Sequence, residues 1–465
     1  MSFASIDFII FFAVVYGGCY LIERTCPVRV KELFLLAASY FFYGYWDWRF
    51  CFLLLFVTVS SYLTAKHAEN KAVFAVGVIV PLLVLGYFKY ANFFLDSASA
   101  IIGKELGTLR IILPVGISFY TFQALSYVID VHRKKIETEH DFVRLALYVS
   151  FFPQLVAGPI VKASEFLPQL KEDRHTGLRN FERGIQIMAF GLFKKIVLAD
   201  HLSVFVDDVY SKPGIFHWST LLIAAMAYYM QIYLDFSGYS DMAIGCAKCF
   251  GYDFFRNFNI SFISRNLTEF WRRQHISLST WLKEYLYIPL GGNRKGKVRQ
   301  NLNLFITMFL GGLWHGANWT FAFWGGLNGL VLILEKLVPG KNDRVKSPVY
   351  QTVRIVINFV FVSLTLIFFR AGSFTTSWAV LSGIFTLQRG IVQPFFWFFA
   401  TAVIYVIAGT ACIVKSGEKD FSRANGFYPV LDLGTVKGLT IFLTVCGLIL
   451  GLAYTGDNPF MYFQF

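Results

Sequence analysis

Long apolar runs separated by short polar or charged segments dominate the chain. Several runs reach the roughly 20 residues that an α-helix needs to cross the hydrocarbon core of a bilayer, and others are shorter. They lie near residues 8–22, 33–46, 50–65, 72–90, 111–129, 142–160, 184–199, 219–234, 302–314, 319–334, 353–369, 393–414 and 438–454. This pattern predicts an all-α polytopic membrane protein with about eleven transmembrane helices plus re-entrant or partial helices.

The composition agrees with a membrane protein. Of the 465 residues, 56% are hydrophobic and 15% are charged, and the mean hydropathy is +0.55. A soluble globular domain carries about 25% charged residues, so an ordinary soluble protein is excluded. The sequence contains no tandem repeat and no low-complexity linker. Residues 1–465 are therefore predicted to form a single integral-membrane domain.

The charge balance is basic, with 42 Lys and Arg against 29 Asp and Glu and a net charge of +13. The basic residues gather between apolar runs, at residues 24–31, 66–71, 133–135, 162–183, 294–299 and 336–346. In a membrane protein such clusters mark cytoplasmic loops. We therefore predict a lipid bilayer as the surroundings, no nucleic-acid partner, and an N-terminus outside the cytoplasm.

His315 is the leading candidate for chemistry. It lies between the apolar runs 302–314 and 319–334, and an ionisable group at that depth usually marks a functional site. Histidine also moves protons near neutral pH. If the segment is one helix, Thr307, Gly311, His315 and Asn318 share a face. The alternative is a polar residue that hydrogen-bonds to a neighbouring helix.

A second histidine lies 40 residues earlier, at His275. Read as one helix, residues 270–282 place Trp271, His275, Leu278 and Leu282 on one apolar face. A lone histidine in such a position is more often a satisfied structural residue. The presence of His315 strengthens the functional interpretation of His275.

Polar residues interrupt the run between positions 113 and 130, where Ser118, Tyr120, Thr121, Gln123 and Ser126 lie among apolar neighbours. Two interpretations are open. These side chains form hydrogen bonds between helices, or they line a cavity that contains water.

Residues 151–160 contain two prolines and a glycine within seven residues, from Pro153 to Pro159. Such a segment does not sustain a regular helix. Irregular backbone at membrane depth is tolerated only where protein buries it or water reaches it. The segment is predicted to be re-entrant or to form a cavity wall.

Asp235 and Asp241 flank a Ser-Gly-Tyr sequence that we interpret as a turn. The two aspartates form a carboxylate pair, cap the following helix, or pair with an arginine. The spacing Cys246-x-x-Cys249 is compatible with metal or redox chemistry, but no second pair and no histidine lie near it in the sequence. No metal site is predicted.

Residues 270–292 and 311–318 together resemble the membrane-bound O-acyltransferase family, and in particular its bacterial branch that O-acetylates alginate. Further matches occur in the family's order at residues 119–127, 151–159, 233–241 and 460–465. One position departs from the family pattern. Gln274 stands where the family usually has a tryptophan before its first histidine, which puts the usual environment of His275 in doubt.

The resemblance implies a funnel-shaped helical bundle in the bacterial cytoplasmic (inner) membrane, with His315 and His275 as catalytic residues. It implies acetyl-CoA as a cytoplasmic thioester donor and no bound cofactor. It also implies a polysaccharide acceptor and an extracytoplasmic acetyltransferase partner protein.

Roles follow for the candidate residues. His315 acts as the general base, while His275, Asn318 or backbone amides hold the thioester oxygen. Trp314, Asn318, Arg294 and Lys295 are candidate donor-binding residues, the last two through the phosphates of coenzyme A. For the basic loop 293–299, ordinary anchoring on the cytoplasmic side is an equally good interpretation.

Two other functions stay open from the sequence. A transporter would also have polar helices that line a path, although no inverted repeat is visible. A D-alanyl transferase of the teichoic acid type would take its acyl group from a carrier-protein thioester. The motif set fits acetylation better.

Overall fold

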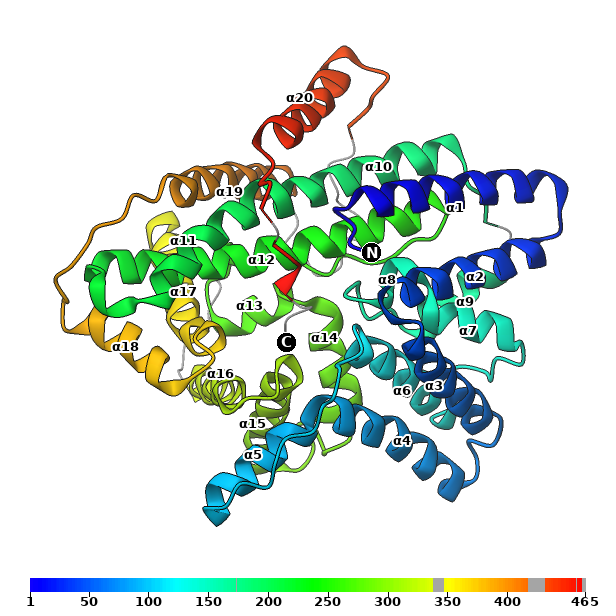
Figure 1. The fold of residues 1–465 in the computed structure, drawn as a ribbon, viewed down its shortest axis with the longest axis horizontal. Coiled ribbons are helices and arrows are strands. Elements are labelled where there is room, and N and C mark those ends of the chain that lie inside the picture. The colour runs from blue at the N-terminus through cyan, green and yellow to red at the C-terminus, as the bar shows by residue number, and fades with distance from the viewer. Residues whose placement is uncertain (173, 338–346, 417–430, 457, 462–465) are drawn as a thin grey trace. The chain divides into compact units, whose positions relative to one another are not determined.

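The computed structural model describes residues 1–172, 174–337, 347–416, 431–456 and 458–461. Within these residues the regular structure is helical, apart from one isolated parallel bridge between Phe216 and Ile391 (Figure 1). The predicted all-α fold is confirmed. Residues 338–346 of the last basic cluster and residues 462–465 of the terminal match lie outside the described residues.

Contacts divide the chain into two compact units. The first comprises Met1–Gly191, Tyr239–Phe255 and Tyr428–Phe442. The second comprises Leu192–Gly238, Arg256–Phe427 and Leu443–Phe465. That residues 1–465 form a single domain stays a prediction.

The first unit is built from short and long helices, and side chains cap three of them. The side chains of Ser5, Asn70 and Asp141 accept hydrogen bonds from backbone N–H groups in the first turns of α1, α4 and α7. The helices are α1 (Ile6–Thr25), α2 (Val28–Asp47), α3 (Arg49–Lys66), α4 (Lys71–Leu85), α5 (Ala91–Ile102), α6 (Ile117–His132), α7 (Phe142–Ser150), α8 (Phe152–Leu155), α9 (Ala163–Lys171) and α10 (Leu178–Leu192). A π-helical turn, Gly86–Tyr90, joins α4 to α5.

The proline-containing segment 151–160 is irregular, as predicted. Only Phe152–Leu155 is helical, and every residue of the segment is buried. Protein therefore surrounds this broken backbone. The five polar residues of α6 are also buried, and Tyr148 on α7 donates a hydrogen bond of 3.2 Å to the Gln123 carbonyl oxygen. Because that contact uses the Gln123 backbone, and the side chains of Thr121 and Gln123 have no hydrogen-bond partner among the described residues, both interpretations stay open.

The second unit contains most of the remaining helices. They are α11 (Asp200–Ser211), α12 (Trp218–Cys249), α13 (Leu267–Arg273), α14 (Ile276–Leu282), α15 (Gly296–His315), α16 (Trp319–Leu337), α17 (Pro348–Arg370), α18 (Phe374–Phe385), α19 (Phe396–Ser416) and α20 (Val436–Leu452). Helices α12 and α20 each contribute residues to both units. Shorter helical turns are Phe193–Ala199, Pro213–Ile215, Ser261–Ile263 and Lys283–Tyr287.

Four helical stretches among the described residues are long and apolar enough to cross a membrane: Ile6–Thr25, Arg49–Lys66, Lys71–Ile102 and Val349–Arg370. On α1, the large apolar side chains of Ile9, Val14 and Leu21 are exposed, which suits a surface in contact with lipid. The predicted number of about eleven crossings stays a prediction.

The Ser-Gly-Tyr sequence after Asp235 is not a turn, and this prediction was wrong. Helix α12 continues unbroken to Cys249 (Figure 1). The Asp235 carboxylate instead pairs with the Lys195 ammonium at 2.6 Å, and the same ammonium lies 2.8 Å from Asp200. The partner of Asp235 is thus a lysine, where the sequence suggested an arginine. The Asp235 carboxylate also accepts a hydrogen bond from the Met461 backbone N–H.

We expect Lys195→Met to destabilise the protein strongly, because it leaves two buried carboxylates without their cation. Breaking a buried ion pair by removing one partner costs about 3–5 kcal/mol. Denaturant unfolding of the detergent-solubilised protein measures the change in the free energy of unfolding. The exposed Lys212→Met variant is the control and should change little; equal stability of the two variants would contradict the structural role of Lys195.

Candidate active site

His315 is the last residue of α15 and is buried, as are Thr307 and Gly311 on the same helix. The shared face of these three residues is therefore confirmed. Asn318 does not belong to it, because the helix ends at His315 and Gly316 is extended. The predicted four-residue face was wrong at that position.

Helices α15 and α16 lie side by side in very close contact (Figure 1). A Cβ atom on Gly325 would lie 2.3 Å from the Met308 carbonyl oxygen and 2.9 Å from the Gly312 Cα. A Cβ atom on Gly312 would lie 2.3 Å from the Phe321 carbonyl oxygen. Only glycine permits this approach of the two backbones, and it places His315 against the side chains of α16.

Residues 270–282 do not form one helix, and that prediction was wrong. Helix α13 ends at Arg273, α14 begins at Ile276, and His275 between them has a left-handed backbone with φ of 44°. The break is held by an upstream loop: the Asn257 carbonyl accepts from the Ile276 N–H at 2.8 Å, and the Arg273 carbonyl accepts from the Asn259 N–H at 2.8 Å. Left-handed backbone is uncommon outside glycine and collects at functional sites.

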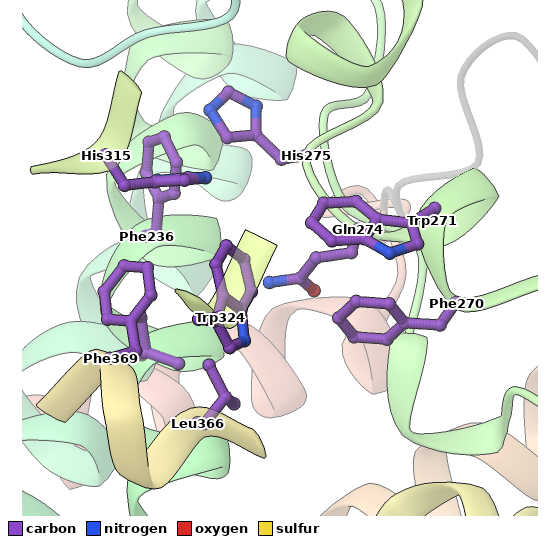
Figure 2. A pocket seen from close by; sticks show the side chains of 10 residues that line it. Phe236, Phe270, Trp271, Gln274, His275, His315, Trp324, Leu366 and Phe369 are labelled. Atoms are coloured by element: carbon purple, nitrogen blue, oxygen red, sulfur yellow. The ribbon is translucent and has the colours of Figure 1, made fainter. Parts of the chain in front are cut away.

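The break brings the two histidines together. The ring centroids of His275 and His315 are 6.3 Å apart, and both rings are buried. Figure 2 shows the two imidazoles with Phe236, Gln274 and Trp324 around a common space. The cavity measures about 30 Å³, enough for a water molecule or two. Its lining residues, all in the second unit, are Ile232, Phe236, Phe270, Trp271, Gln274, His275, His315, Trp324, Leu366 and Phe369.

Carboxylates hold α13 in place beside the cavity. The Glu335 side chain on α16 accepts hydrogen bonds from the backbone N–H groups of Leu267 and Thr268, at 2.6 and 3.1 Å. A negative charge at the start of a helix is favoured by the helix dipole. Glu269 forms ion pairs with Arg265 and Arg273, both at 2.8 Å. The Arg273 guanidinium is thus engaged by Glu269, and Arg273 is absent from the lining of the cavity.

The four candidate donor-binding residues lie in different surroundings. Arg294 and Lys295 are exposed just before α15, and Trp314 is buried with its ring centroid 5.7 Å from that of His275. The Asn318 side chain donates to the Gly372 carbonyl at 2.9 Å and accepts from the Thr320 N–H at 2.9 Å. These bonds give Asn318 a structural role at the start of α16. Its part in donor binding, like those of Arg294, Lys295 and Trp314, stays a prediction.

Sequence reasoning missed most of the cavity wall. Phe236 on α12 approaches the His275 ring at 4.7 Å between centroids, and Phe369 on α17 approaches His315 at 5.3 Å. Nothing in the local sequence distinguishes these phenylalanines among the 52 in the chain. Besides the two histidines, the sequence had singled out Trp271, on the apolar face with His275, and Gln274, which departs from the family motif.

The chain is similar to enzymes that transfer acyl groups. The sequence model of the membrane-bound O-acyltransferase family matches residues 132–340, which include both histidines. The chain is 42% identical to the probable alginate O-acetylase AlgI of Pseudomonas aeruginosa, covering 83% of this chain and 75% of that protein. It is 36% identical to the protein of the same name from Pseudomonas putida, over the full length of both. It is also 36% identical to the peptidoglycan O-acetyltransferase of Helicobacter pylori, covering 77% and 74%.

We expect Gly325→Ala to destabilise the protein, because the added methyl group would force α15 and α16 apart. Overpacking of this kind costs about 1–3 kcal/mol. The neighbouring Gly326→Ala is the matched control, since its Cβ would lie no closer than 3.5 Å to the Phe305 ring. Thermal unfolding in detergent compares the two. Equal midpoints would contradict the inference that backbone contact at Gly325 positions α15.

Proposed function

Because the chain belongs to the membrane-bound O-acyltransferase family and is a membrane O-acyltransferase, we propose that it takes an acetyl group from cytoplasmic acetyl-CoA and passes it across the membrane. The final acceptor is a hydroxyl of an extracytoplasmic polysaccharide. The observation that carries the proposal is the pair of buried imidazoles, His275 and His315, facing one small cavity.

Acetyl transfer to a hydroxyl needs a base and a group that stabilises the developing oxyanion. His315 takes the proton as the hydroxyl oxygen of the first acceptor, which later passes the acetyl group on toward the polysaccharide, attacks the thioester carbonyl carbon. The carbon–sulfur bond then breaks, and His315 returns the proton to the departing thiolate. His275 donates a hydrogen bond to the carbonyl oxygen. A general base contributes roughly 100- to 10,000-fold, so positioning by the cavity supplies much of the remaining rate enhancement.

The size and lining of the cavity support a short acyl group. A space of about 30 Å³ suits two carbons better than a long alkyl chain. The aromatic side chains of Phe236, Trp324 and Phe369 provide apolar contact for a methyl group. The cavity is therefore compatible with an acetyl group.

The distribution of basic residues and the family resemblance support a proposal for the membrane, its orientation and the partner protein. The protein is proposed to cross the bacterial inner membrane several times, with the exposed Arg294 and Lys295 on the cytoplasmic side, where the phosphates of coenzyme A bind. A separate extracytoplasmic acetyltransferase completes transfer to the polysaccharide. The similar proteins act on alginate or on peptidoglycan by their names, and this chain is proposed to acetylate a polymer of that general class.

The two rival functions differ in a measurable way. A D-alanyl transferase would accept D-alanine from a carrier-protein thioester and would not use acetyl-CoA. A transporter would move its substrate without forming a new ester. Polymer labelled from [acetyl-¹⁴C]acetyl-CoA supports the acetyltransferase, and unlabelled polymer rejects it.

We expect His315→Ala to lower acetyl transfer by at least about 100-fold, the low end for a lost general base. The label carried into polymer by membranes that also contain the acceptor partner measures this. His217→Ala, a half-buried histidine outside the cavity, is the control and should keep its activity. Near-normal transfer by a well-expressed His315→Ala would remove His315 from the mechanism.

His275 is tested with two substitutions that suit its left-handed backbone. Asparagine and glycine both tolerate a positive φ, whereas leucine adds strain. We expect His275→Asn to keep partial activity because its amide still donates a hydrogen bond. His275→Gly should lose about 100- to 1,000-fold, as when one oxyanion donor is removed. Equal, near-normal turnover by the two variants would leave His275 a structural residue.

The membrane orientation is tested by cysteine labelling in a variant without the seven native cysteines. We expect cysteines at the exposed positions Lys134 and Lys295 to react with an impermeant reagent only from the cytoplasmic side, because basic loops stay there. A cysteine at the exposed Trp48 should react only from outside. Reaction of Lys295→Cys from outside would overturn the orientation.

A further inference from the structure

Gln274 lines the histidine cavity and belongs to a chain of hydrogen bonds that leads away from it. Its side-chain oxygen accepts from the Ser261 hydroxyl at 2.8 Å, and the Ser261 oxygen accepts from the Tyr229 hydroxyl at 3.0 Å. Tyr229 is on α12 and Ser261 opens a short helical turn, so two separate elements hold this one amide. All three residues belong to the second unit.

The donor and acceptor roles in this chain of hydrogen bonds are fixed at its buried end, at Tyr229. Tyr229 is 1% exposed, and the rings of Phe262, Phe270 and Phe359 lie 5.0, 6.0 and 5.1 Å from its own. Among the described residues, Ser261 alone is hydrogen-bonded to the Tyr229 hydroxyl. A buried hydroxyl that fails to donate is costly, so Tyr229 donates and Ser261 accepts.

Since the Ser261 oxygen accepts from Tyr229, its own proton is directed to the Gln274 oxygen. The Gln274 amide therefore cannot rotate by half a turn without losing a bond, and its Nε2 is directed away from Ser261. Figure 2 shows that nitrogen turned toward Trp324 and the interior of the cavity. No residue in the described part of the chain accepts a hydrogen bond from Gln274 Nε2.

Other donors adjoin the same space. The indole Nε1 atoms of Trp271 and Trp324 are buried, and neither has an acceptor among the described residues. Buried indole N–H groups usually have a partner. A wall with apolar rings and several N–H donors that still lack an acceptor matches a ligand with a carbonyl oxygen and a small alkyl group.

We propose that Gln274 binds the acyl group, with its Nε2–H donating a hydrogen bond to the thioester carbonyl oxygen while Tyr229 and Ser261 hold the amide in that orientation. Gln274 is thereby a binding residue for the thioester carbonyl and acts beside His275. This inference rests on the proposed function, because it needs a thioester donor in the histidine cavity.

Two non-reactive analogues of acetyl-CoA isolate the carbonyl contact. One is the ketone in which a methylene replaces the thioester sulfur, and the other is S-ethyl-coenzyme A, which lacks the carbonyl. Their inhibition constants are measured against acetyl-CoA with the intact protein and its acceptor partner. We expect the native protein to prefer the ketone by more than the roughly 3- to 10-fold that one net hydrogen bond gives, because His275 and Gln274 both donate to the carbonyl.

Substitutions then locate the source of that preference. Gln274→Leu keeps the bulk without the donor and should lower the preference by roughly 3- to 10-fold, which leaves only the part that His275 contributes. Gln274→Glu should lower it further, because a carboxylate oxygen faces the carbonyl. Tyr229→Phe removes the donor to Ser261, so the Ser261 hydroxyl can donate to or accept from Gln274 and the amide can adopt either orientation. This variant should reduce the preference for the ketone although Gln274 itself is unchanged. Gln300→Leu, the same substitution outside the cavity, is the control.

The outcomes separate the inference from the function on which it rests. If acetyl-CoA is used and the native protein prefers the ketone, but Gln274→Leu keeps that preference, the role of Gln274 is wrong and the function stands. The same holds if the native protein shows no preference. If neither analogue competes and acetyl-CoA is not turned over, the donor is wrong and the inference fails with it. Elution volume and thermal midpoint confirm that each variant is folded.

Discussion

A protein surrounded by hydrocarbon has to satisfy its buried polar groups from within, since lipid offers neither donors nor acceptors. In the second unit, buried charges have close partners at Lys195 and Glu335, whereas the histidine cavity is arranged differently. Lys195 is enclosed by two carboxylates, and Glu335 receives two backbone N–H groups at the start of α13. At the cavity, by contrast, imidazole, amide and indole groups share a small space walled by aromatic rings. The indole N–H groups of Trp271 and Trp324 have no acceptor among the described residues, so this cavity, and not the Lys195 cluster, is where a ligand is expected.

Features of the fold and the site that depend on neighbouring residues could be predicted from the sequence, and those that depend on residues distant in the chain could not. Apolar runs predicted most long helices, because helix formation depends on neighbouring residues and an apolar run is visible in the local sequence. The pairing of His275 with His315 was suggested by depth and family resemblance together. The break before His275 was not predictable, since residues 270–282 keep a helical period; Asn257 and Asn259, far upstream, decide it. Likewise the sequence pattern did not reveal that Asp235, inside a continuous helix, pairs with the distant Lys195.

The backbone contributes to the position of both histidines, in addition to the aromatic rings packed against them. His315 depends on the contact between Gly312 and Gly325, and His275 on a left-handed residue between two short helices. Backbone geometry of this kind is stiff, because it changes only if whole helices move. A site built on it keeps its catalytic groups within the few tenths of an ångström that productive geometry requires.

The bond between the Asp235 carboxylate and the Met461 amide has a consequence for biosynthesis. These groups are 226 residues apart, so the ribosome makes the carboxylate long before its last partner. Asn458, which donates to Asp200 at 2.8 Å, is also made late. During translation α12 therefore enters the membrane with an incomplete set of partners for its carboxylate. Until residues 458–461 are made, Lys195 is the cation that compensates the Asp235 carboxylate, and the hydrogen bonds from Met461 and Asn458 complete the cluster afterwards.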